Sequence, residues 1–184
     1  MKTLFCILGR TASGKDTLSD EVCKKCRINK LISYTTRPPR NNYENTHIFA
    51  TKEDFINFAA NGQIVASTQI GEYYYWSTFE QLQECDLYII NPEGIDFIKQ
   101  INLPDIKLVT IYIKAPEEER YKRAYIRCPD VDAFNKRNIA EDEQFTKIEN
   151  EQAWDYIVYN NRFIDACEEL IQIITKEKGA ENVF

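Results

Sequence analysis

The chain has 184 residues, 43% of them hydrophobic and 28% charged, which is typical of one soluble folded domain and gives no compositional sign of disorder. Its net charge of -6 argues against nonspecific binding to nucleic acid or to an anionic membrane, because such binding needs a basic surface. The apolar run at the N-terminus stops at Gly9, too early for a signal peptide or a membrane span, so we expect a cytoplasmic protein.

The chain opens with a strand and a helix on either side of a glycine-rich segment. Residues 2–8 form a continuous apolar run, as in a strand buried on both faces of a parallel sheet. Over residues 15–25, apolar side chains recur at spacings of four, which predicts a helix. A second short strand is predicted at residues 30–34, and the prolines that follow hold residues 35–40 extended.

Residues 33–78 are expected to form a small inserted lobe of strands and one helix. Thr51-x-x-Asp54 resembles a capping box, which opens a helix that continues to Ala60. Two β-like runs follow at residues 63–70 and 72–76.

The second half of the chain alternates strands with helices. Strands are predicted at residues 86–90, 107–113 and 155–159, and helices after Pro92 and at residues 117–127, 131–152 and 163–176, with an interruption at Cys128-Pro129-Asp130. This alternation predicts an α/β fold with a parallel sheet and helices on both faces, whose ligands bind at the carboxyl ends of the strands.

The six cysteines lie in apolar or helical stretches of a chain large enough to be stable without disulfides, so we expect reduced thiols. The spacing of Cys23 and Cys26 matches half of a zinc site. There is no second pair, however, and His47 is the only histidine of the sequence. We therefore interpret the pair as two thiols on one helix.

Residues 9–17 nearly satisfy the phosphate-loop pattern G-x-x-x-x-G-K-[ST]. The glycines let backbone N–H groups turn toward phosphate oxygens, and the helix that starts near Lys15 adds its positive end. Because the segment follows a buried strand and opens a helix, we interpret it as an ATP-binding loop rather than as an incidental glycine-rich turn. The expected ATP-binding residues are Gly9, Thr11, Ala12, Ser13, Gly14, Lys15, Asp16 and Thr17.

One position departs from the phosphate-loop pattern. Asp16 stands where a hydroxyl group normally ligates magnesium. A carboxylate is also a hard oxygen ligand, so Asp16 is a candidate ligand of Mg2+, directly or through water, with ATP as the phosphoryl donor.

Arg37 and Arg40 lie three residues apart on the proline-rich segment and are candidates to hold the phosphate of an acceptor. The alternative for both is a solvated surface. His47 is a candidate to add a switchable positive charge beside them, and its alternative is an ordinary half-exposed histidine on a strand.

Taken in order along nearly the whole chain, these motifs resemble those of the guanylate kinase-like family of phosphate-loop kinases. The resemblance rests on residues 9–17, on Ser33-Tyr34-Thr35-Thr36-Arg37-Pro38-Pro39-Arg40, on Tyr73-Tyr74-Tyr75-Trp76-Ser77, and on Arg123, Arg127 and Asn135-Lys136-Arg137. It implies a single domain over residues 1–184. In that domain a phosphate-loop NTPase-type core (1–32, 79–122 and 141–184) carries an acceptor-binding lobe (33–78) and a helical lid (123–140).

The resemblance also implies roles for individual residues. The expected catalytic residues are Lys15, Arg37, Arg123, Arg127 and Arg137, and the expected acceptor-binding residues are Ser33, Arg37, Arg40, His47, Ala66, Tyr75, Ser77 and Asn91. Arginines of a lid can neutralise charge on the migrating phosphoryl group and help to exclude water. The alternative for the three lid arginines is salt bridging with the acidic runs at residues 117–119 and 141–143.

Three positions depart from the family pattern. Ala66 stands where the family has a guanine-selecting Glu, Asn91 where it has an acid, and His47 where it has a phosphate-binding Tyr. These departures resemble a sister group, the ribose 1,5-bisphosphate phosphokinases, which share the Gly-Lys-Asp ending of the phosphate loop and a string like Glu44-Asn45-Thr46-His47-Ile48. The run at residues 35–40 looks more like the nucleotide kinases.

The resulting prediction is an ATP-dependent kinase that transfers the γ-phosphoryl group to the phosphate of a nucleoside monophosphate, GMP or a related nucleotide. The alternatives are a ribose 1,5-bisphosphate phosphokinase and, from a different class, a non-catalytic guanylate kinase-like binding module. The expected partners are ATP and a small phosphorylated acceptor, with no nucleic acid and no membrane, and the expected state is a monomer or homodimer.

Overall fold

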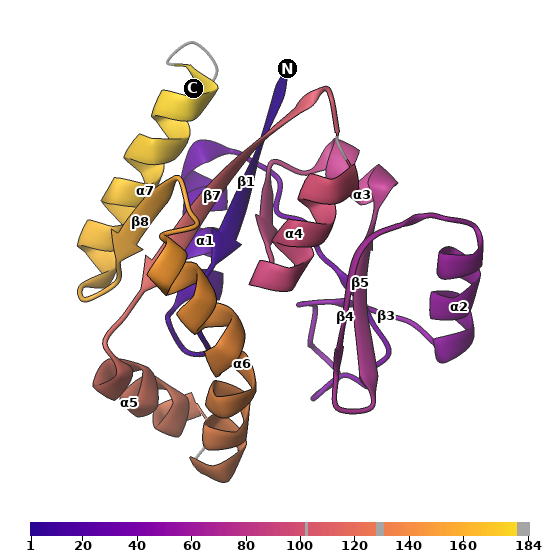
Figure 1. Cartoon of the computed structure of the whole chain (residues 1–184). Coiled ribbons are helices and arrows are strands. Elements are labelled where there is room, and N and C mark those ends of the chain that lie inside the picture. The colour runs from indigo at the N-terminus through magenta and orange to yellow at the C-terminus, as the bar shows by residue number, and fades with distance from the viewer. Residues whose placement is uncertain (102, 128–130, 180–184) are drawn as a thin grey trace.

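The computed structural model describes residues 1–101, 103–127 and 131–179, and within them the chain forms two four-stranded sheets (Figure 1). The central sheet has the strand order β6-β1-β7-β8, with β1 at Lys2–Leu8, β6 at Leu87–Ile89, β7 at Ile106–Lys114 and β8 at Tyr156–Tyr159. The second sheet has the order β3-β2-β5-β4, with β2 at Tyr34–Thr35, β3 at Ile48–Phe49, β4 at Ile64–Ile70 and β5 at Tyr73–Thr78. The helices are α1 (Lys15–Cys26), α2 (Lys52–Ala60), α3 (Phe79–Glu84), α4 (Pro92–Ile101), α5 (Glu117–Arg127), α6 (Val131–Glu151) and α7 (Phe163–Lys178).

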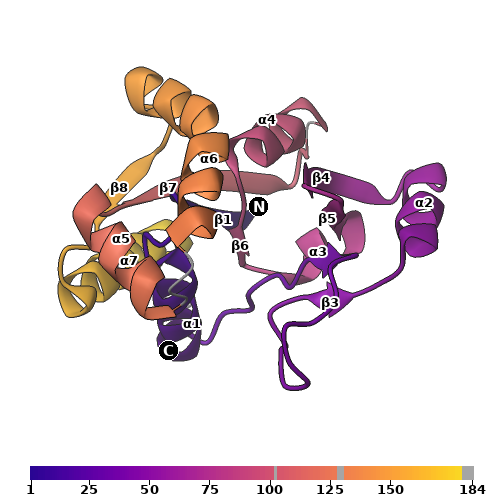
Figure 2. The ribbon, with the colours of Figure 1, turned by 90° about the horizontal axis from the view of Figure 1, so that it is seen from below.

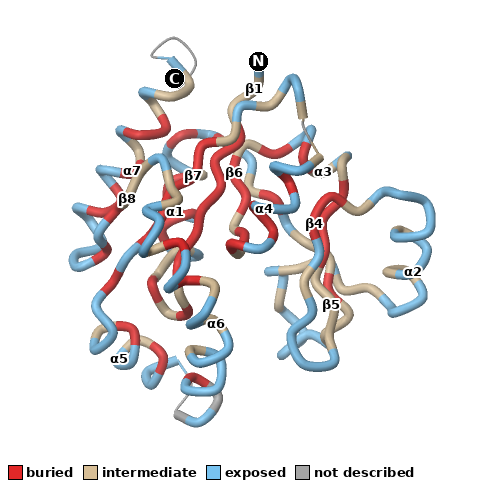
Figure 3. Tube along the Cα trace, viewed as in Figure 1, coloured by how far each residue is buried: buried red, intermediate tan, exposed pale blue. Residues whose placement is uncertain are grey.

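The central sheet is parallel because each of its strands returns through a helical crossover. Strand β1 pairs in parallel with β6 and β7, and β7 pairs in parallel with β8. Figure 3 shows that the trace of β1 is buried along most of its length. This confirms the α/β fold that the sequence predicts.

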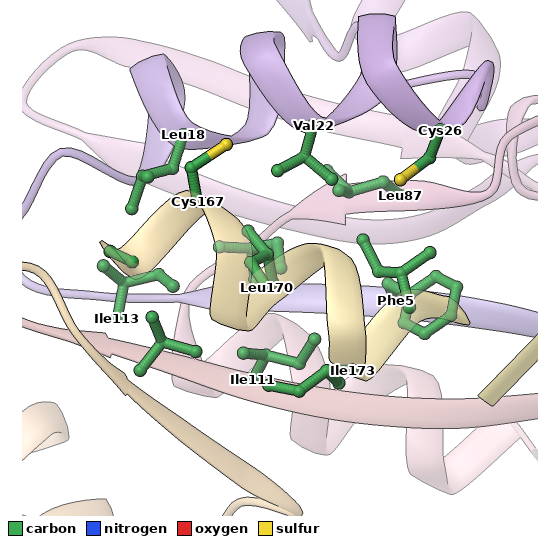
Figure 4. Packing of buried hydrophobic residues seen from close by; sticks show 14 of the residues in the cluster. Phe5, Leu18, Val22, Cys26, Leu87, Ile111, Ile113, Cys167, Leu170 and Ile173 are labelled. Atoms are coloured by element: carbon green, nitrogen blue, oxygen red, sulfur yellow. The ribbon is translucent and has the colours of Figure 1, made fainter. Parts of the chain in front are cut away.

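Alternate side chains of β1 pack on opposite faces of the central sheet, as strand geometry requires. Phe5 and Ile7 join the apolar cluster that α1 and α7 cover, which Figure 4 shows from close by. Leu4 and Cys6 join the cluster on the other face, to which α4 and α6 contribute. Helices therefore cover both faces of the central sheet, and β1, from which the phosphate-loop segment leaves, is packed on both faces.

The second sheet and α2 extend to one side of the central sheet, whereas α5 and α6 lie toward the other side (Figure 2). Helix α2 begins at the capping box that the sequence predicts, with the side chain of Thr51 accepting from the backbone N–H of Asp54 and the Asp54 carboxylate accepting from Thr51. The hairpin between β4 and β5 turns at Gly71, which has a φ of +61°.

Two details differ from the prediction. The strand expected at residues 30–34 is wrong: only Lys30 forms a single bridge to Leu87, and β2 belongs to the second sheet. Helix α3 and strand β3 were not predicted, because six residues and two residues are too short for a periodic signal. The interruption predicted at Cys128-Pro129-Asp130 lies outside the described residues.

Among the residues that the structure describes, no helix is long and apolar enough to cross a membrane.

Candidate active site

The phosphate-loop segment leaves β1 at Leu8 and enters α1 at Lys15 through a series of turns. Two glycines permit this path. A Cβ on Gly9 would lie 2.6 Å from Oγ of Ser13 and 2.8 Å from the carbonyl oxygen of Ile113. Gly14 has a φ of +89°, and a Cβ there would overlap Nδ2 of Asn160. Neither position tolerates a side chain, so the compact loop depends on both glycines.

Side chains from distant elements hold the loop through its carbonyl oxygens. Arg123 of α5 donates to the carbonyl of Ser13 at 3.1 Å and to that of Asn160 at 2.8 Å. Nδ2 of Asn160 donates to the same Ser13 carbonyl at 2.7 Å. The buried guanidinium of Arg120 donates to the carbonyl of Thr11 at 3.3 Å. These hydrogen bonds to its carbonyl oxygens fix the path of the loop.

Arg10 ties the same loop to helix α6. Its guanidinium donates to Asp142 at 2.8 Å and to Glu149 at 3.1 Å, and these carboxylates raise the pKa of Arg10 further above its usual range although burial acts against them. The carboxylate of Glu149 also accepts from the hydroxyl of Tyr112 at the end of β7. The loop is therefore tied to α6, whose residues up to 140 belong to the predicted lid, through two carboxylates that lie beyond the lid.

A cleft of about 550 Å³ lies between the phosphate loop, the second sheet and α6. Most of the residues that the sequence singles out line it: Gly9, Lys15, Asp16, Ser33, Arg37, Arg40, His47, Ala66, Tyr75, Asn91, Arg127 and Arg137. They come from β4 and β5 of the second sheet, from α1, α5 and α6, from the start of α4 and from the loops between these elements. One continuous cavity thus joins the phosphate loop to the basic segment.

Lys15 presents its ammonium group to this cleft. Burial lowers its pKa, while the carboxylates of Asp16 and Glu141 act in the opposite direction, and Arg137 and Arg127 lower it further. A desolvated ammonium among other cations is a strong site for an anion.

Arg37 is held on the far side of the cleft by Glu44. Its guanidinium donates to the two carboxylate oxygens of Glu44 at 2.7 Å and 3.2 Å, and Glu44 also accepts from the backbone N–H of Arg40 at 2.5 Å. The Arg37 hydrogen bonds, followed by that N–H, lower the pKa of Glu44 to about 2. Nε of Arg37 is buried and has no hydrogen-bond partner among the described residues, so it remains a donor for a ligand.

His47 lies against Tyr75, with ring centroids 5.5 Å apart in an edge-on arrangement. Its Nδ1 is 2.9 Å from the hydroxyl of Thr46. Burial lowers the pKa of His47, and the positive charges of Arg37 and Arg40 lower it further. Both effects favour the neutral imidazole in the free protein.

The floor of the cleft is neutral. Ala66 is buried in β4, and the buried hydroxyl of Ser77 is 2.8 Å from the hydroxyl of Tyr88, which itself lines the cleft. Oδ1 of Asn91 accepts from the backbone N–H of Gly94 at 3.1 Å and so caps α4, while its amide nitrogen donates a long hydrogen bond of 3.5 Å to Oε1 of Gln144 on α6. Hydroxyl and amide groups that line this floor can bind a polar acceptor without supplying a charge.

Comparison with known proteins agrees with this geometry. The family model for guanylate kinase matches residues 1–177. This chain belongs to the guanylate kinase family. Its relatives include the guanylate kinase of Geobacter metallireducens, 27% identical over 187 aligned residues that cover 95% of this chain and 89% of that protein. The guanylate kinase of Koribacter versatilis is 30% identical, and the alignment covers 96% of this chain and 79% of that protein.

A solved structure shares the fold of this guanylate kinase family member. The crystal structure of guanylate kinase from Anaplasma phagocytophilum superposes with a TM-score of 0.70 and 19% sequence identity, covering 99% of this chain and 89% of that chain. At this identity the likeness supports the fold, and the roles of individual residues rest on the geometry of this chain.

Seven expected site residues do not line the cleft: Thr11, Ala12, Ser13, Gly14, Thr17, Ser77 and Arg123. Gly14 shapes the phosphate loop as described above, and Thr17 is exposed in the first turn of α1. The other five lie close to the cleft. Ser77 stands behind Tyr88, and Arg123 directs its donors at the back of the phosphate loop. Thr11, Ala12 and Ser13 form the turn itself, with Ser13 facing a second, smaller cavity of about 310 Å³. In this structure these residues support the loop and the cleft floor, and their direct contact with a nucleotide stays a prediction.

Sequence reasoning missed several residues that shape the site: Arg10, Glu44, Arg120, Glu141 and Asn160. Glu44 pairs with Arg37, seven residues away, and the other four bind partners more than 100 residues away in the sequence. Only Arg120 could have been found from the sequence: it lies three residues before Arg123 on the same helix, and residues at this spacing share one helix face.

Asp16 is the candidate magnesium ligand of this family member. Its exposed carboxylate lines the cleft beside Lys15, and Mg2+ typically takes one or two carboxylates together with phosphates and water. No group of three or more His, Cys, Asp or Glu side chains suited to a metal ion occurs within the described ranges. A site with one protein carboxylate, completed by the phosphates of ATP and by water, fits the position of Asp16 and the lack of further protein ligands among the described residues.

Proposed function

We propose that this protein transfers the γ-phosphoryl group of ATP to the phosphate of a nucleoside monophosphate, GMP or a related nucleotide. The observation that carries the proposal is the single cleft in which Lys15, at the end of the phosphate loop, and Arg37, with its unpartnered Nε, both stand. Two anion sites in one cavity suit a reaction between two phosphates. The names and the coverage of the relatives support the same reaction.

At the donor end, Lys15 would bind the β- and γ-phosphates together with the N–H groups of the loop. Arg127 and Arg137 line the same cleft and would neutralise the charge that spreads over the migrating phosphoryl group. Asp16 would hold Mg2+, which supplies a divalent charge to the ATP phosphates when it is bound. Arg123 would support the loop from behind.

At the acceptor end, Arg37, Arg40, Tyr75 and Ser33 would hold the acceptor phosphate, and His47 would add a fifth group. The phosphate of a nucleotide is already ionised at pH 7, so the reaction needs no side-chain base. Positioning of the two phosphates and neutralisation of their charge would provide most of the rate acceleration, and the arginines and the lysine that line the cleft suit both roles.

We further propose that the elements of residues 33–78 act as the acceptor-binding lobe, residues 123–140 as the lid and the rest as the core. The ribose 1,5-bisphosphate phosphokinase and the non-catalytic module are not favoured, because the matching relatives described above are named guanylate kinases. The cytoplasm is the proposed location, and a monomer or homodimer the proposed state.

The experiment is a coupled assay of ADP release by purified protein with Mg-ATP. GMP, AMP, CMP, UMP and ribose 1,5-bisphosphate are added separately, and the products are identified by chromatography. A nucleoside monophosphate should stimulate ADP release and give the corresponding diphosphate. Stimulation by ribose 1,5-bisphosphate alone, or by no acceptor, would contradict the proposal.

A further inference from the structure

The carboxylate of Glu141, on α6, lies against the phosphate loop. It accepts a hydrogen bond of 2.7 Å from the backbone N–H of Thr11 and a second of 2.7 Å from the hydroxyl of Thr11. Its side chain is only 20% exposed. Backbone N–H groups of a loop that leads into a helix N-terminus are the donors that bind phosphate, so Glu141 occupies part of an anion site.

The same carboxylate also holds a lid arginine. Nε of Arg137, one helical turn earlier on α6, donates to Glu141 at 3.1 Å. Both side chains line the cleft with Lys15. In the free protein, Arg137 therefore has its charge neutralised by an internal anion at the place where the phosphates of ATP are expected.

Phosphate and carboxylate compete for the same donors in this arrangement. Two anions that share Thr11 would repel each other in a partly desolvated cleft. Helix α6 itself is held to the loop by the ion pairs of Arg10 with Asp142 and Glu149. The Glu141 side chain can thus leave the loop while the helix remains attached.

We propose that Glu141 is a competitor of the ATP phosphates: it holds Thr11 and Arg137 in the free protein, and ATP displaces it and releases Arg137 to the phosphates. Glu141 is accordingly a positioning residue that sets the affinity for ATP. The inference rests on the proposed function only in taking ATP as the donor, and it does not depend on the acceptor.

The test compares equilibrium binding of ATP, with and without Mg2+ and with no acceptor present, to the wild-type protein and to Glu141→Gln. The variant keeps the shape of the side chain and removes its charge. We expect roughly tenfold tighter binding of ATP, the effect of removing one competing charge from a partly exposed site. Thermal stability of the ligand-free variant should fall, because the hydrogen bonds from Thr11 lose their charged acceptor.

The matched control is Glu143→Gln, which makes the same change in net charge at an exposed position of the same helix and should change the affinity less than twofold. A purely structural Glu141, or one that ligates Mg2+, predicts equal or weaker binding in Glu141→Gln, and either result would overturn the proposal. The acceptor assay is separate. Tighter ATP binding in Glu141→Gln without turnover on any nucleotide would refute the proposed function and leave this inference standing.

Discussion

Nδ2 of Asn160 donates a 2.7 Å hydrogen bond to the carbonyl oxygen of Ser13, across 147 residues of sequence. Asn160 follows β8, at the edge of the central sheet, and is 3% exposed. Arg123 donates to the same carbonyl. The shape of the phosphate loop is therefore fixed by residues that no phosphate-loop pattern contains.

Gly14 is the position where this contact leaves no room. Replacing Gly14 with Ala places a Cβ against Nδ2 of Asn160 and 3.4 Å from Nη1 of Arg123, at a φ of +89°. We expect a loss of about 2–4 kcal/mol in the free energy of unfolding, measured with urea, and a loss of ATP binding. Gly71→Ala is the control, because Gly71 also has a positive φ but its Cβ would meet nothing within 4 Å. Equal losses in the two variants would show that the Asn160 contact is unimportant.

Ala12 is strained within the same loop. It has a φ of +62°, in the left-handed region that disfavours a side chain. Ala12→Gly should raise the free energy of unfolding by about 0.5–1 kcal/mol, since relief of strain exceeds the entropy that glycine adds to the unfolded chain. Ala140→Gly, at an exposed position of α6, should lower it by about 1 kcal/mol. Urea unfolding measures both, and a loss in both would exclude strain at Ala12.

Lys15 is expected to be required for turnover and dispensable for folding. Burial lowers the pKa of its ammonium and so disfavours the charged form in the folded protein, and its removal should not lower the free energy of unfolding. Lys15→Ala should lower kcat by about a thousandfold or more, because the charge that stabilises the transferred phosphoryl group is lost. Lys24→Ala, exposed on the same helix, should leave kcat unchanged. Turnover near the wild-type rate in Lys15→Ala would remove its proposed role.

The order of strands and helices could be predicted from the sequence because each long element carries its own signal. The apolar run of β1 and the repeat of Leu18, Val22 and Cys26 on α1 identify a buried strand and a helix without reference to the rest of the chain. The strand predicted at residues 30–34 was wrong because Leu31 is apolar for another reason: it packs in the core, and the segment forms only a single bridge, from Lys30 to Leu87. Helix α3 begins at a capping box formed by Thr78 and Gln81, but it has only six residues and follows directly on β5, so it has no periodic pattern of its own.

The site was predictable where a motif is continuous in sequence and unpredictable where a partner comes from elsewhere. The phosphate loop and the Arg37–Arg40 pair are local, and both reach the cleft. The choice of Glu141 as the partner of Thr11, and of Asn160 as the partner of Ser13, depends on how the chain folds back. Spacing along the chain carries no information about such distant contacts.

His47 should make acceptor binding depend on pH. Its pKa is lowered below the usual 6.5 by burial and by Arg37 and Arg40, with Glu44 and Asp16 acting in the opposite direction. A bound phosphate favours the imidazolium form, so binding takes up a proton and the acceptor KM should fall as the pH falls from 8 toward 6.5.

His47→Gln removes this titration and serves as the comparison. Between pH 8 and 6.5, the wild-type KM for the acceptor should fall by roughly two- to fivefold relative to that of the variant, while ionisation of the acceptor phosphate affects both alike. In the protein without acceptor, by contrast, lowering the pH should be unfavourable: it should lower the free energy of unfolding. Because the folded pKa lies below the unfolded one, the unfolded chain binds more protons below pH 6.5, so acid lowers the free energy of unfolding in the wild type more than in His47→Gln. Parallel KM profiles in the two proteins would show that His47 does not contact the acceptor phosphate.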